Sequence, residues 1–555
     1  MKRKHLAHTP TVTQPLGTSS APCGRGNHAL VARLPLLVSL LTAMTVLAAP
    51  ERAAAQQAVP KVVVNILIDQ LRSDYLHAFM PLYGEEGFAR LLREGKVYTQ
   101  AAYPHYRPDR ASAAATLATG TTPYNHGVVG LQWIDRTTLR PVHCVDDEHY
   151  TGIQTTDHTA PTYLGVSTFG DELKVATEGK ALVYAVAPFR DAAVLTAGHA
   201  ADGAVWVDDG TGLWCSTSYY GASLPSWAAV LNTQSLASRI ANLTWRPKND
   251  LVGNFSYFLS GGMKKPFAHK FKEADRFKAY KTSGLINGDV AAAACQCLEG
   301  TMLGTDDVTD YLAVTFYAGN YRHRTVSEAP MELQDTYVRL DDAVAQLVNR
   351  VERKVGKGRA LFVLTSTGYT DEETADLSRF RIPTGTFDVP RAAGLLNMYL
   401  VAVYGQGKFV ETTFGTQIYL NHKLIEQKQI NMAELLERTQ DFLLQLSGVK
   451  DVYTSTRLMQ GAWTPGISSI RGAYNPRYSG DVLIEVSPGW HYVNASHNDN
   501  RLVRESYIPF PIIFMGQGFK SDTVNTPVTT DYIAPTLSEA VRIRAPNACS
   551  HPALP

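Results

Sequence analysis

Long apolar runs and helical periodicities alternate along this 555-residue chain. Residues 61–69 (KVVVNILID), 311–319 (YLAVTFYAG) and 360–368 (ALFVLTSTG) are almost continuously apolar, which is typical of central parallel strands covered on both faces. Between the last two runs, residues 337–356 repeat apolar side chains at helical spacing, at Val338, Leu340, Val344, Leu347, Val348 and Val351. Strand, helix and strand in this order predict a doubly wound, mostly parallel α/β sheet.

Two less regular stretches interrupt this rhythm. The first, at about 205–304, is rich in Trp, Tyr, Ser and Asn, and the second, at about 397–488, contains an amphipathic helix at 432–446. Both are expected to be inserted cap subdomains. The aromatic side chains of the first suit either a platform for sugars or a partner, or packing against the sheet, and we favour packing. The apolar runs 482–490 and 511–519 are expected to return to the core sheet.

The amino terminus has the features of a secretory signal. A basic stretch precedes the apolar run LPLLVSLLTAMTVLAA at residues 34–49, and small residues follow at 53–55. This run is shorter than the roughly 20 residues that span a bilayer as a helix. We therefore interpret residues 1–55 as a cleaved signal peptide, followed by an exported domain at 56–555; an uncleaved membrane anchor is the alternative.

Composition supports a large, mildly acidic, exported protein. Hydrophobic residues make up 45% of the chain, enough for one large core, and the formal net charge is +1. Loss of residues 1–55 removes six basic residues and one acidic residue, which brings the net charge to −4. This balance argues against nucleic acid or a polybasic membrane contact as partner. Five cysteines remain after residue 55, an odd number; we interpret them as structural: Cys144, Cys215, Cys295, Cys297 and Cys549.

Several long segments, in order along the chain, resemble one known family. They are VVVNILIDQLRSDYL, GEEGFARLLREG, TLATGTTPYNHGVVG, TDYLAVTFYAGNY with ELQDTYVRLDDAV, and PVTTDYIAPTLSEAV. The chain resembles the phosphate-irrepressible type of bacterial alkaline phosphatase and, more distantly, the nucleotide pyrophosphatase/phosphodiesterases. The resemblance implies an alkaline-phosphatase-type fold and, in active relatives, two zinc ions held by three Asp and three His with a Thr or Ser nucleophile between them. Two such ions clamp the attacking and leaving oxygens of phosphoryl transfer.

Position by position, the resemblance implies that this machinery is largely absent. The first carboxylate ligand is present as Asp69, but Arg110 stands at the nucleophile position, and Ser112 is the nearest hydroxyl. Leu131 follows HGVVG where relatives have a phosphate-binding Asn. The other ligand positions carry Asn320 and Arg324 after the second strand, Thr367 and Gly368 after the third, and Pro509 or Ile508 before the last. The basic residues that hold phosphate in some relatives fall near Phe189 and Asp191, with Arg190 close by.

Two hypotheses for the altered site follow. Arg110, Arg322, Arg324 and His323 converge on the former zinc position, with Asp69 as counter-ion, and bind phosphate or another anion; the alternative is that these side chains point into solvent. A relocated metal site is the second hypothesis. Its candidates are Asp69, Asp109, His105, His323, His497 and Asp499, of which His497 is the most attractive; the alternative is local hydrogen bonding of these groups.

The interpretation is an exported, non-catalytic member of the alkaline phosphatase superfamily. It is expected to need no cofactor, although active relatives use two zinc ions, and to bind an anionic ligand or a protein partner that the residues do not identify. The alternative is an active phosphomonoesterase or phosphodiesterase with a rearranged metal site, in which Ser112 acts as nucleophile beside Asp69.

Overall fold

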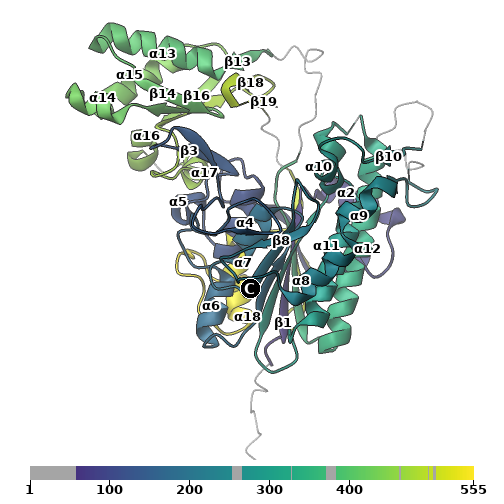
Figure 1. Ribbon diagram of the computed structural model, residues 1–555. Coiled ribbons are helices and arrows are strands. Elements are labelled where there is room, and N and C mark those ends of the chain that lie inside the picture. Colours follow the sequence, from purple (N-terminus) through teal and green to yellow (C-terminus); the bar gives the residue numbers. More distant parts are fainter. Residues whose placement is uncertain are drawn as a thin grey trace, which may run out of the picture. The chain divides into compact units, whose positions relative to one another are not determined.

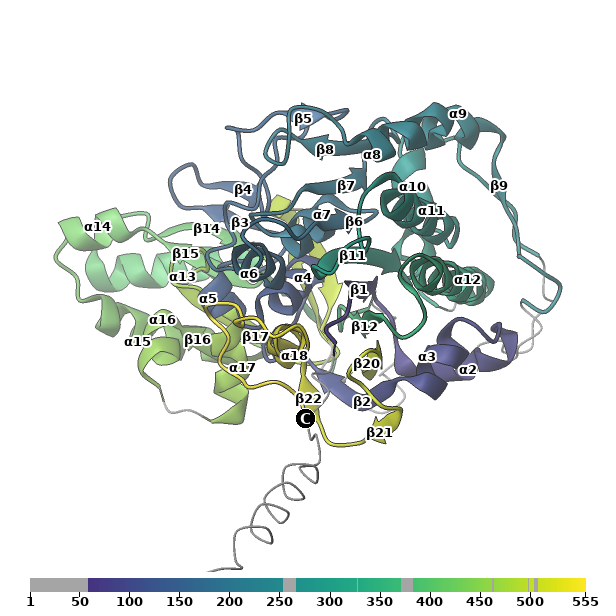
Figure 2. The ribbon, with the colours of Figure 1, turned by 90° about the horizontal axis from the view of Figure 1, so that it is seen from below.

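The main sheet of the protein is mostly parallel. The computed structural model describes residues 58–252, 266–326, 328–370, 383–461, 464–497, 499–503 and 508–555. The strand order is β21-β2-β20-β12-β1-β11-β6-β7-β8-β5, with β22 beside β2 (Figures 1 and 2). The bounds are β1 Val62–Asp69, β2 Lys96–Ala102, β5 Gly152–Ile153, β6 Val183–Val186, β7 Gly203–Val207, β8 Trp214–Thr217, β11 Asp310–Tyr317, β12 Ala360–Ser366, β20 Phe510–Gly516, β21 Asp522–Val524 and β22 Val528–Thr529. The predicted doubly wound α/β sheet is confirmed.

The three apolar runs form adjacent central strands, as predicted. β1 pairs in parallel with β11 on one side and β12 on the other, so that Asp69 lies opposite Tyr317. Successive side chains of β1 enter two different cores: Val64 and Ile66 pack on one face of the sheet, and Val63 and Leu67 on the other. Each fully buried aliphatic side chain contributes about 1.5–3 kcal/mol, so both faces hold the strand ends in place.

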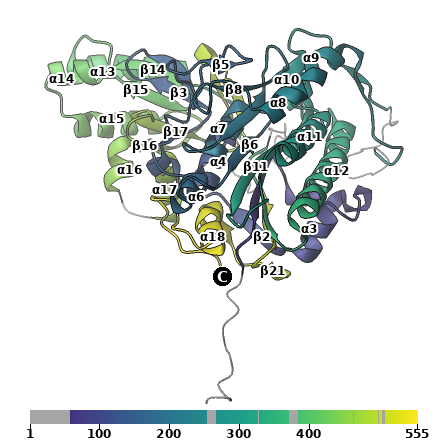
Figure 3. The ribbon, with the colours of Figure 1, turned by 60° about the horizontal axis from the view of Figure 1, so that its bottom comes forward.

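Helices cover both faces of this sheet (Figure 3). One face carries α8 Ser226–Leu231, α11 Leu285–Gly300 and α12 Pro330–Val355; the other carries α4 Arg110–Thr119, α6 Phe169–Ala176, α7 Arg190–Ala197 and α18 Ile533–Ala540. The apolar stripe predicted for α12 is buried along its whole length. β7 and β8, which overlap the stretch expected as a first insertion, belong to the main sheet.

A separate cap follows β12, which we define as the described residues between 386 and 502. Its four-stranded sheet has the order β14-β15-β17-β16, and a three-stranded sheet adds β13-β18-β19. The bounds are β13 Thr386–Asp388, α13 Val389–Tyr404, β14 Val410–Phe414, β15 Gln417–Leu420, α14 His422–Gln427, α15 Met432–Leu444, β16 Val449–Thr454, α16 Ser455–Gln460, α17 Pro465–Ala473, β17 Val482–Val486, β18 His491–Asn494 and β19 Asp499–Leu502. The predicted helix at 432–446 is confirmed as α15.

The run at 482–490 does not return to the main sheet, so that prediction was wrong. β17 lies in the cap sheet, where Val482 and Ile484 enter the cap core and Leu483 packs against a second small cluster on the other face. A strand covered on both faces gives the same continuous apolar run in either sheet. The run at 511–519 does return to the main sheet as β20, where it pairs antiparallel with both β12 and β2.

The segment expected to be a signal peptide, residues 1–55, lies outside the described residues. Within the part of the chain that the structure describes, no helix combines the length and the apolar character needed to cross a membrane. The five cysteines of this part form no disulfide with one another, and all except Cys549 are buried.

Candidate functional site

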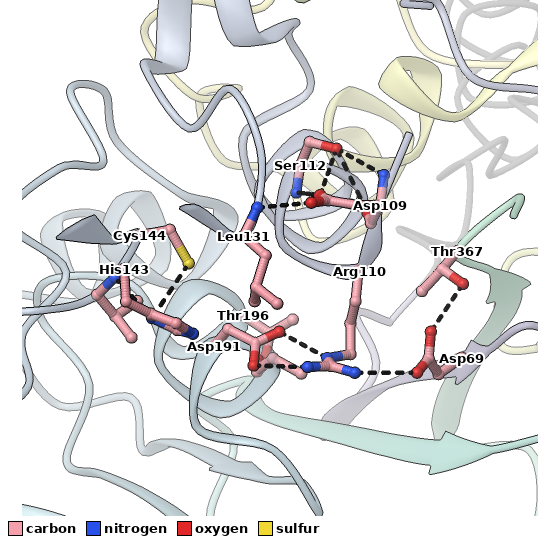
Figure 4. Close-up of polar contacts among 12 residues, drawn as sticks. Asp69, Asp109, Arg110, Ser112, Leu131, His143, Cys144, Asp191, Thr196 and Thr367 are labelled. Atoms are coloured by element: carbon pink, nitrogen blue, oxygen red, sulfur yellow. Dashed lines mark hydrogen bonds and ion pairs between the residues drawn. The ribbon is translucent and has the colours of Figure 1, made fainter. Parts of the chain in front are cut away.

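The carboxyl end of β1 places a single carboxylate in the centre of the sheet edge. Asp69 is the last residue of β1, and its side chain is fully buried. Thr367, directly after β12, donates a hydrogen bond from Oγ1 to Asp69 Oδ1 at 3.0 Å and accepts one from the backbone N–H of Gln70 at 2.8 Å (Figure 4). The neighbouring strand end therefore fixes one oxygen of Asp69.

The other oxygen of Asp69 faces Arg110, the first residue of α4. Nη1 of Arg110 lies 3.4 Å from Asp69 Oδ2. The rest of the guanidinium engages Asp191 of α7 with two hydrogen bonds, from Nε to Oδ2 at 2.6 Å and from Nη2 to Oδ1 at 3.1 Å (Figure 4). Two-pronged contacts of this kind hold a guanidinium in one orientation. We call Asp69, Arg110 and Asp191 the ion-pair cluster.

Aromatic packing closes the cluster from a further side. The guanidinium carbon of Arg110 lies 3.8 Å from the centre of the Phe189 ring, and Nζ of Lys281 lies 4.8 Å from the same centre. A cation over an aromatic face is stabilised by about 0.5–2 kcal/mol. Lys281 also donates a hydrogen bond to the carbonyl of Val207 and pairs with Asp209. An aromatic ring thus lies near the position where some relatives are expected to have a basic residue.

The pKa values of the two carboxyl groups of the cluster shift in opposite directions. Burial tends to raise the pKa of Asp191, but the charge and hydrogen bonds of Arg110 outweigh it and hold the pKa below its ordinary value. Burial raises the pKa of Asp69, and Arg110 offsets this only in part. With Asp191 ionised and Asp69 either ionised or protonated, the cluster carries a net charge of minus one or zero. It presents no surplus positive charge to an anion.

The hydroxyl of Ser112, the alternative nucleophile, takes part in the hydrogen bonds that cap the first turn of α4. Its backbone N–H donates to Asp109 Oδ1 at 2.9 Å, and the backbone N–H of Asp109 donates back to Ser112 Oγ at 3.0 Å. This reciprocal pair is a capping box, which satisfies two amide groups that the helix leaves without partners. The Ser112 side chain is buried beside Asp109 and points away from Asp69 (Figure 4).

The other basic candidates are placed elsewhere. Nη2 of Arg322 pairs with Glu273 Oε2 at 2.6 Å and with Asp275 Oδ1 at 2.9 Å. Arg324 is exposed, with its guanidinium 5.9 Å from the ring centre of Tyr321. His323 is also exposed. Of the four groups expected to surround the former zinc position, the structure joins only Arg110 to Asp69.

Arg322 and His323 are held in an uncommon backbone conformation. Their φ angles are +53° and +54°, in the left-handed region that non-glycine residues seldom adopt. Directly before them, Asn320 is buried, and its Nδ2 has no hydrogen-bond partner among the described residues. The loop after β11 therefore keeps a strained path around the strand end, while its basic side chains pair with acids or face solvent.

The candidates for a relocated metal site do not come together. His497 lies in the cap, where its ring packs 5.0 Å from that of Phe414, and Asp499 pairs with Arg501. His105 is buried, and Asp109 caps α4. In the described part of the chain, no three His, Cys, Asp or Glu side chains are grouped so that they could hold a metal ion.

Three residues of this site were not recognised from the sequence as partners. Asp191, Thr367 and Phe189 were noted only as departures from expected positions, whereas the structure makes them the contacts of Arg110 and Asp69. One clue was available: a new arginine at position 110 and a new carboxylate at position 191 are changes of opposite charge within one expected site. Such a pair of changes is consistent with an ion pair.

Comparison with known proteins decides the family. The family model for type I phosphodiesterase / nucleotide pyrophosphatase matches residues 63–509. The chain belongs to this family. It is 28% identical to alkaline phosphatase PafA of Elizabethkingia meningoseptica over 509 residues, which cover 88% of this chain and 92% of PafA. Identity to alkaline phosphatase PhoV of Synechococcus elongatus is also 28%, covering 88% of this chain and 91% of PhoV.

A solved structure supports the same assignment. The crystal structure of wild-type PafA superimposes with a TM-score of 0.78 at 26% sequence identity, covering 89% of this chain and 98% of that chain. The predicted membership of the alkaline phosphatase superfamily and the predicted fold type are therefore confirmed.

The residues around Asp69 do not fit the pair of zinc ions that the resemblance implies. Zinc sites use about three or four protein ligands per ion. Here Oδ1 of Asp69 accepts from Thr367, Oδ2 faces a guanidinium, and Asp191 is held by the same guanidinium. A fixed positive charge between the only two carboxylates of the ion-pair cluster repels a cation.

Proposed function

We propose that this chain is an exported, non-hydrolytic member of the phosphodiesterase and alkaline phosphatase superfamily. In this proposal the ion-pair cluster takes the structural place of the metal centre and ties β1, α4 and α7 together. The protein then acts as a binding or scaffolding protein outside the cytoplasm. The assignment to the superfamily rests on the fold and the family match. The expectation of no substrate turnover rests on the contacts of Arg110 with Asp69 and Asp191.

One observation carries the proposal: the guanidinium of Arg110 stands between Asp69 and Asp191 at 2.6 to 3.4 Å. Arginine stays protonated at any physiological pH and has no lone pair to donate, so it is neither a nucleophile nor a general base. Three of the five N–H donors of this guanidinium already contact Asp69 and Asp191, so it is not free to clamp two oxygens of a phosphoryl group as two metal ions do.

The alternative of an active enzyme with Ser112 as nucleophile conflicts with the role of its neighbour. A serine nucleophile is activated by a base or a metal ion within hydrogen-bond reach. Oγ of Ser112 does lie 2.9 Å from the carboxylate of Asp109, but this carboxylate caps α4: its Oδ1 accepts from the backbone N–H of Ser112 and its Oδ2 from the N–H of Leu131. Attack on phosphate by Ser112 would require the first turn of α4 to open.

Export is part of the proposal and rests on the amino-terminal sequence. A basic stretch, a 16-residue apolar run at 34–49 and small residues at 53–55 support a cleaved secretory signal. Expression of the full chain followed by cell fractionation and amino-terminal sequencing tests this point. A mature end near residue 56 is expected, and a full-length cytoplasmic product would refute export.

A hydrolysis assay tests the main claim. Purified protein is incubated with p-nitrophenyl phosphate and with its bis-ester at mildly alkaline pH, with and without added zinc, beside PafA as the positive control. We expect release of p-nitrophenol at the level of the buffer blank. Turnover that survives purification and disappears in Ser112→Ala would establish the alternative function.

The same preparation tests the hypothesis of an anion site. Three N–H donors of Arg110 already contact Asp191 and Asp69, and these two carboxyl groups lie beside any anion that approaches it, so we expect millimolar phosphate or sulfate to leave the melting temperature unchanged. A rise that saturates with phosphate and is absent in Arg110→Met would instead assign the site to anion binding.

A further inference from the structure

The outer face of helix α13 in the cap is exposed and apolar. Met398 is 62% exposed and Leu395 is 36% exposed, and Gly394 and Ala402 beside them are exposed as well. At 100° per residue these four positions fall within one stripe along the helix. Figure 1 shows α13 on the outside of the cap. We call these four positions the α13 stripe.

The opposite face of α13 is apolar too. Ala392, Ala393, Leu396 and Leu400 are buried in the cap core. No charged residue occurs between Arg391 and Lys408, a stretch that includes the rest of the helix. A surface helix normally carries charged or polar residues on the face that it turns to water, whereas a helix that is apolar all round is buried. The α13 stripe therefore has the composition of a covered surface.

We propose that the α13 stripe is the interface of a homodimer, in which α13 of a second copy packs antiparallel about a twofold axis beside Met398. The two small residues of the stripe are placed symmetrically about this residue. Gly394 and Ala402 each lie four positions from Met398, so a twofold axis there sets small residue opposite small residue. Small residues let two helices approach closely and leave room for the larger Leu395 and Met398 side chains.

The charges at the two ends of α13 favour the same arrangement. Arg391 lies seven positions before Met398 in the first turn, and Gly405 follows the helix seven positions after it. Arg391 is exposed at the positive end of its own helix dipole, where a cation is not stabilised. In an antiparallel pair it lies beside the carbonyl end of the second helix, which attracts a cation. A twofold axis forms this contact twice, as an interface between identical surfaces requires.

Sedimentation velocity of the mature chain tests the dimer. At about 100 μM protein we expect a dimer, and we expect Met398→Glu to weaken its association by about tenfold or more, because the buried centre of the interface then carries two like charges. Met302→Glu is the matched control: Met302 is 68% exposed directly after α11, outside the cap. This control should dimerise like the wild type.

A cross-linking measurement gives an independent result. A residue beside a twofold axis lies close to its own copy, so Met398→Cys should form a disulfide-linked dimer under mild oxidation, whereas Met302→Cys should not. A wild-type chain that stays monomeric at about 100 μM overturns the proposal, as does a dimer unaffected by Met398→Glu. Binding of the monomer to lipid vesicles through Met398 would likewise overturn it and assign the stripe to a membrane.

Discussion

Replacement of Arg110 by Met should destabilise the protein strongly at neutral pH. The substitution keeps the volume of the side-chain stem but removes the guanidinium that Asp69 and Asp191 share. Asp191 is 2% exposed, so water cannot take the place of the lost hydrogen bonds. Removal of one partner from a buried ion pair typically costs about 3–5 kcal/mol.

The stability lost in Arg110→Met is set mainly by the free energy needed to protonate Asp191. Without Arg110, the least costly state of Asp191 at pH 7 is the protonated one. Protonation at pH 7 of a group with an ordinary pKa of 3.8 costs about 4 kcal/mol, at about 1.4 kcal/mol per pH unit. For a chain of this size that corresponds to a fall of about 4 °C in melting temperature. Asp69 adds less, because burial already raises its pKa and it accepts a proton more readily.

The stability loss in Arg110→Met should depend on pH, because the pKa of Asp191 shifts in opposite directions in the wild type and in the variant. In the wild type the pKa of Asp191 is lowered, so its pairing contributes stability above the ordinary pKa of 3.8 and loses it as the pH falls further. In Arg110→Met the pKa of Asp191 is raised, so the penalty grows with rising pH. We expect the loss in unfolding free energy to shrink from about 4 kcal/mol at pH 7 to about 2 kcal/mol at pH 5.

Urea denaturation measures the loss in unfolding free energy. It is carried out on the wild type, Arg110→Met, Arg110→Lys and the double variant Arg110→Met/Asp191→Leu. Arg110→Lys keeps the charge without the two-pronged contact and should fall between the first two. The double variant removes both members of the pair and should recover at least half of the loss. A loss below about 1 kcal/mol in Arg110→Met, or one independent of pH, would refute the reasoning.

Other substitutions probe the surroundings of the cluster. Burial lowers the pKa of His105 to about 4, so the folded state keeps this side chain neutral and loses stability as the pH falls below 6.5. The wild type should therefore lose more unfolding free energy than His105→Gln between pH 7.5 and pH 5, by about 2 kcal/mol. An equal loss in both proteins would contradict the neutral, buried state of His105. Arg322→Ala should cost less than about 1 kcal/mol in urea, because its partners Glu273 and Asp275 are exposed; a larger loss would place Arg322 in a buried network. Ser112→Ala should cost about 1 kcal/mol through loss of the capping box without changing hydrolysis, and a stable, unaltered α4 would contradict the capping role.

Much of the fold could be predicted because its central strands are buried on both faces. β1, β11 and β12 are recognisable in the sequence as continuous apolar runs, and α12 is recognisable as an apolar stripe at helical spacing. The antiparallel orientation of β20 could not be predicted, since an apolar run looks the same whether the strand pairs in parallel or antiparallel. The sheet to which β17 belongs could not be predicted either, because the cap buries both faces of this strand as the main sheet would.

The site was predicted in part. Position along the chain places Asp69 and Arg110 at one sheet edge, and the structure joins them. The fate of Arg322 depends on Glu273 and Asp275, nearly fifty residues earlier, and on a left-handed turn at Arg322 itself. Neither the pairing nor the turn leaves a local sequence pattern, so a count of charges near the strand ends overestimates the positive charge around Asp69.

The central claim is that a guanidinium has replaced the metal centre, and zinc content tests it most directly. The purified chain and PafA are dialysed side by side against zinc, then against buffer, and analysed by plasma mass spectrometry. We expect this chain to retain no more than about a tenth of an equivalent of zinc, because Asp69 and Asp191 are already held by Arg110. Retention of about two equivalents, lost on substitution of Asp69 by Ala, would contradict the account.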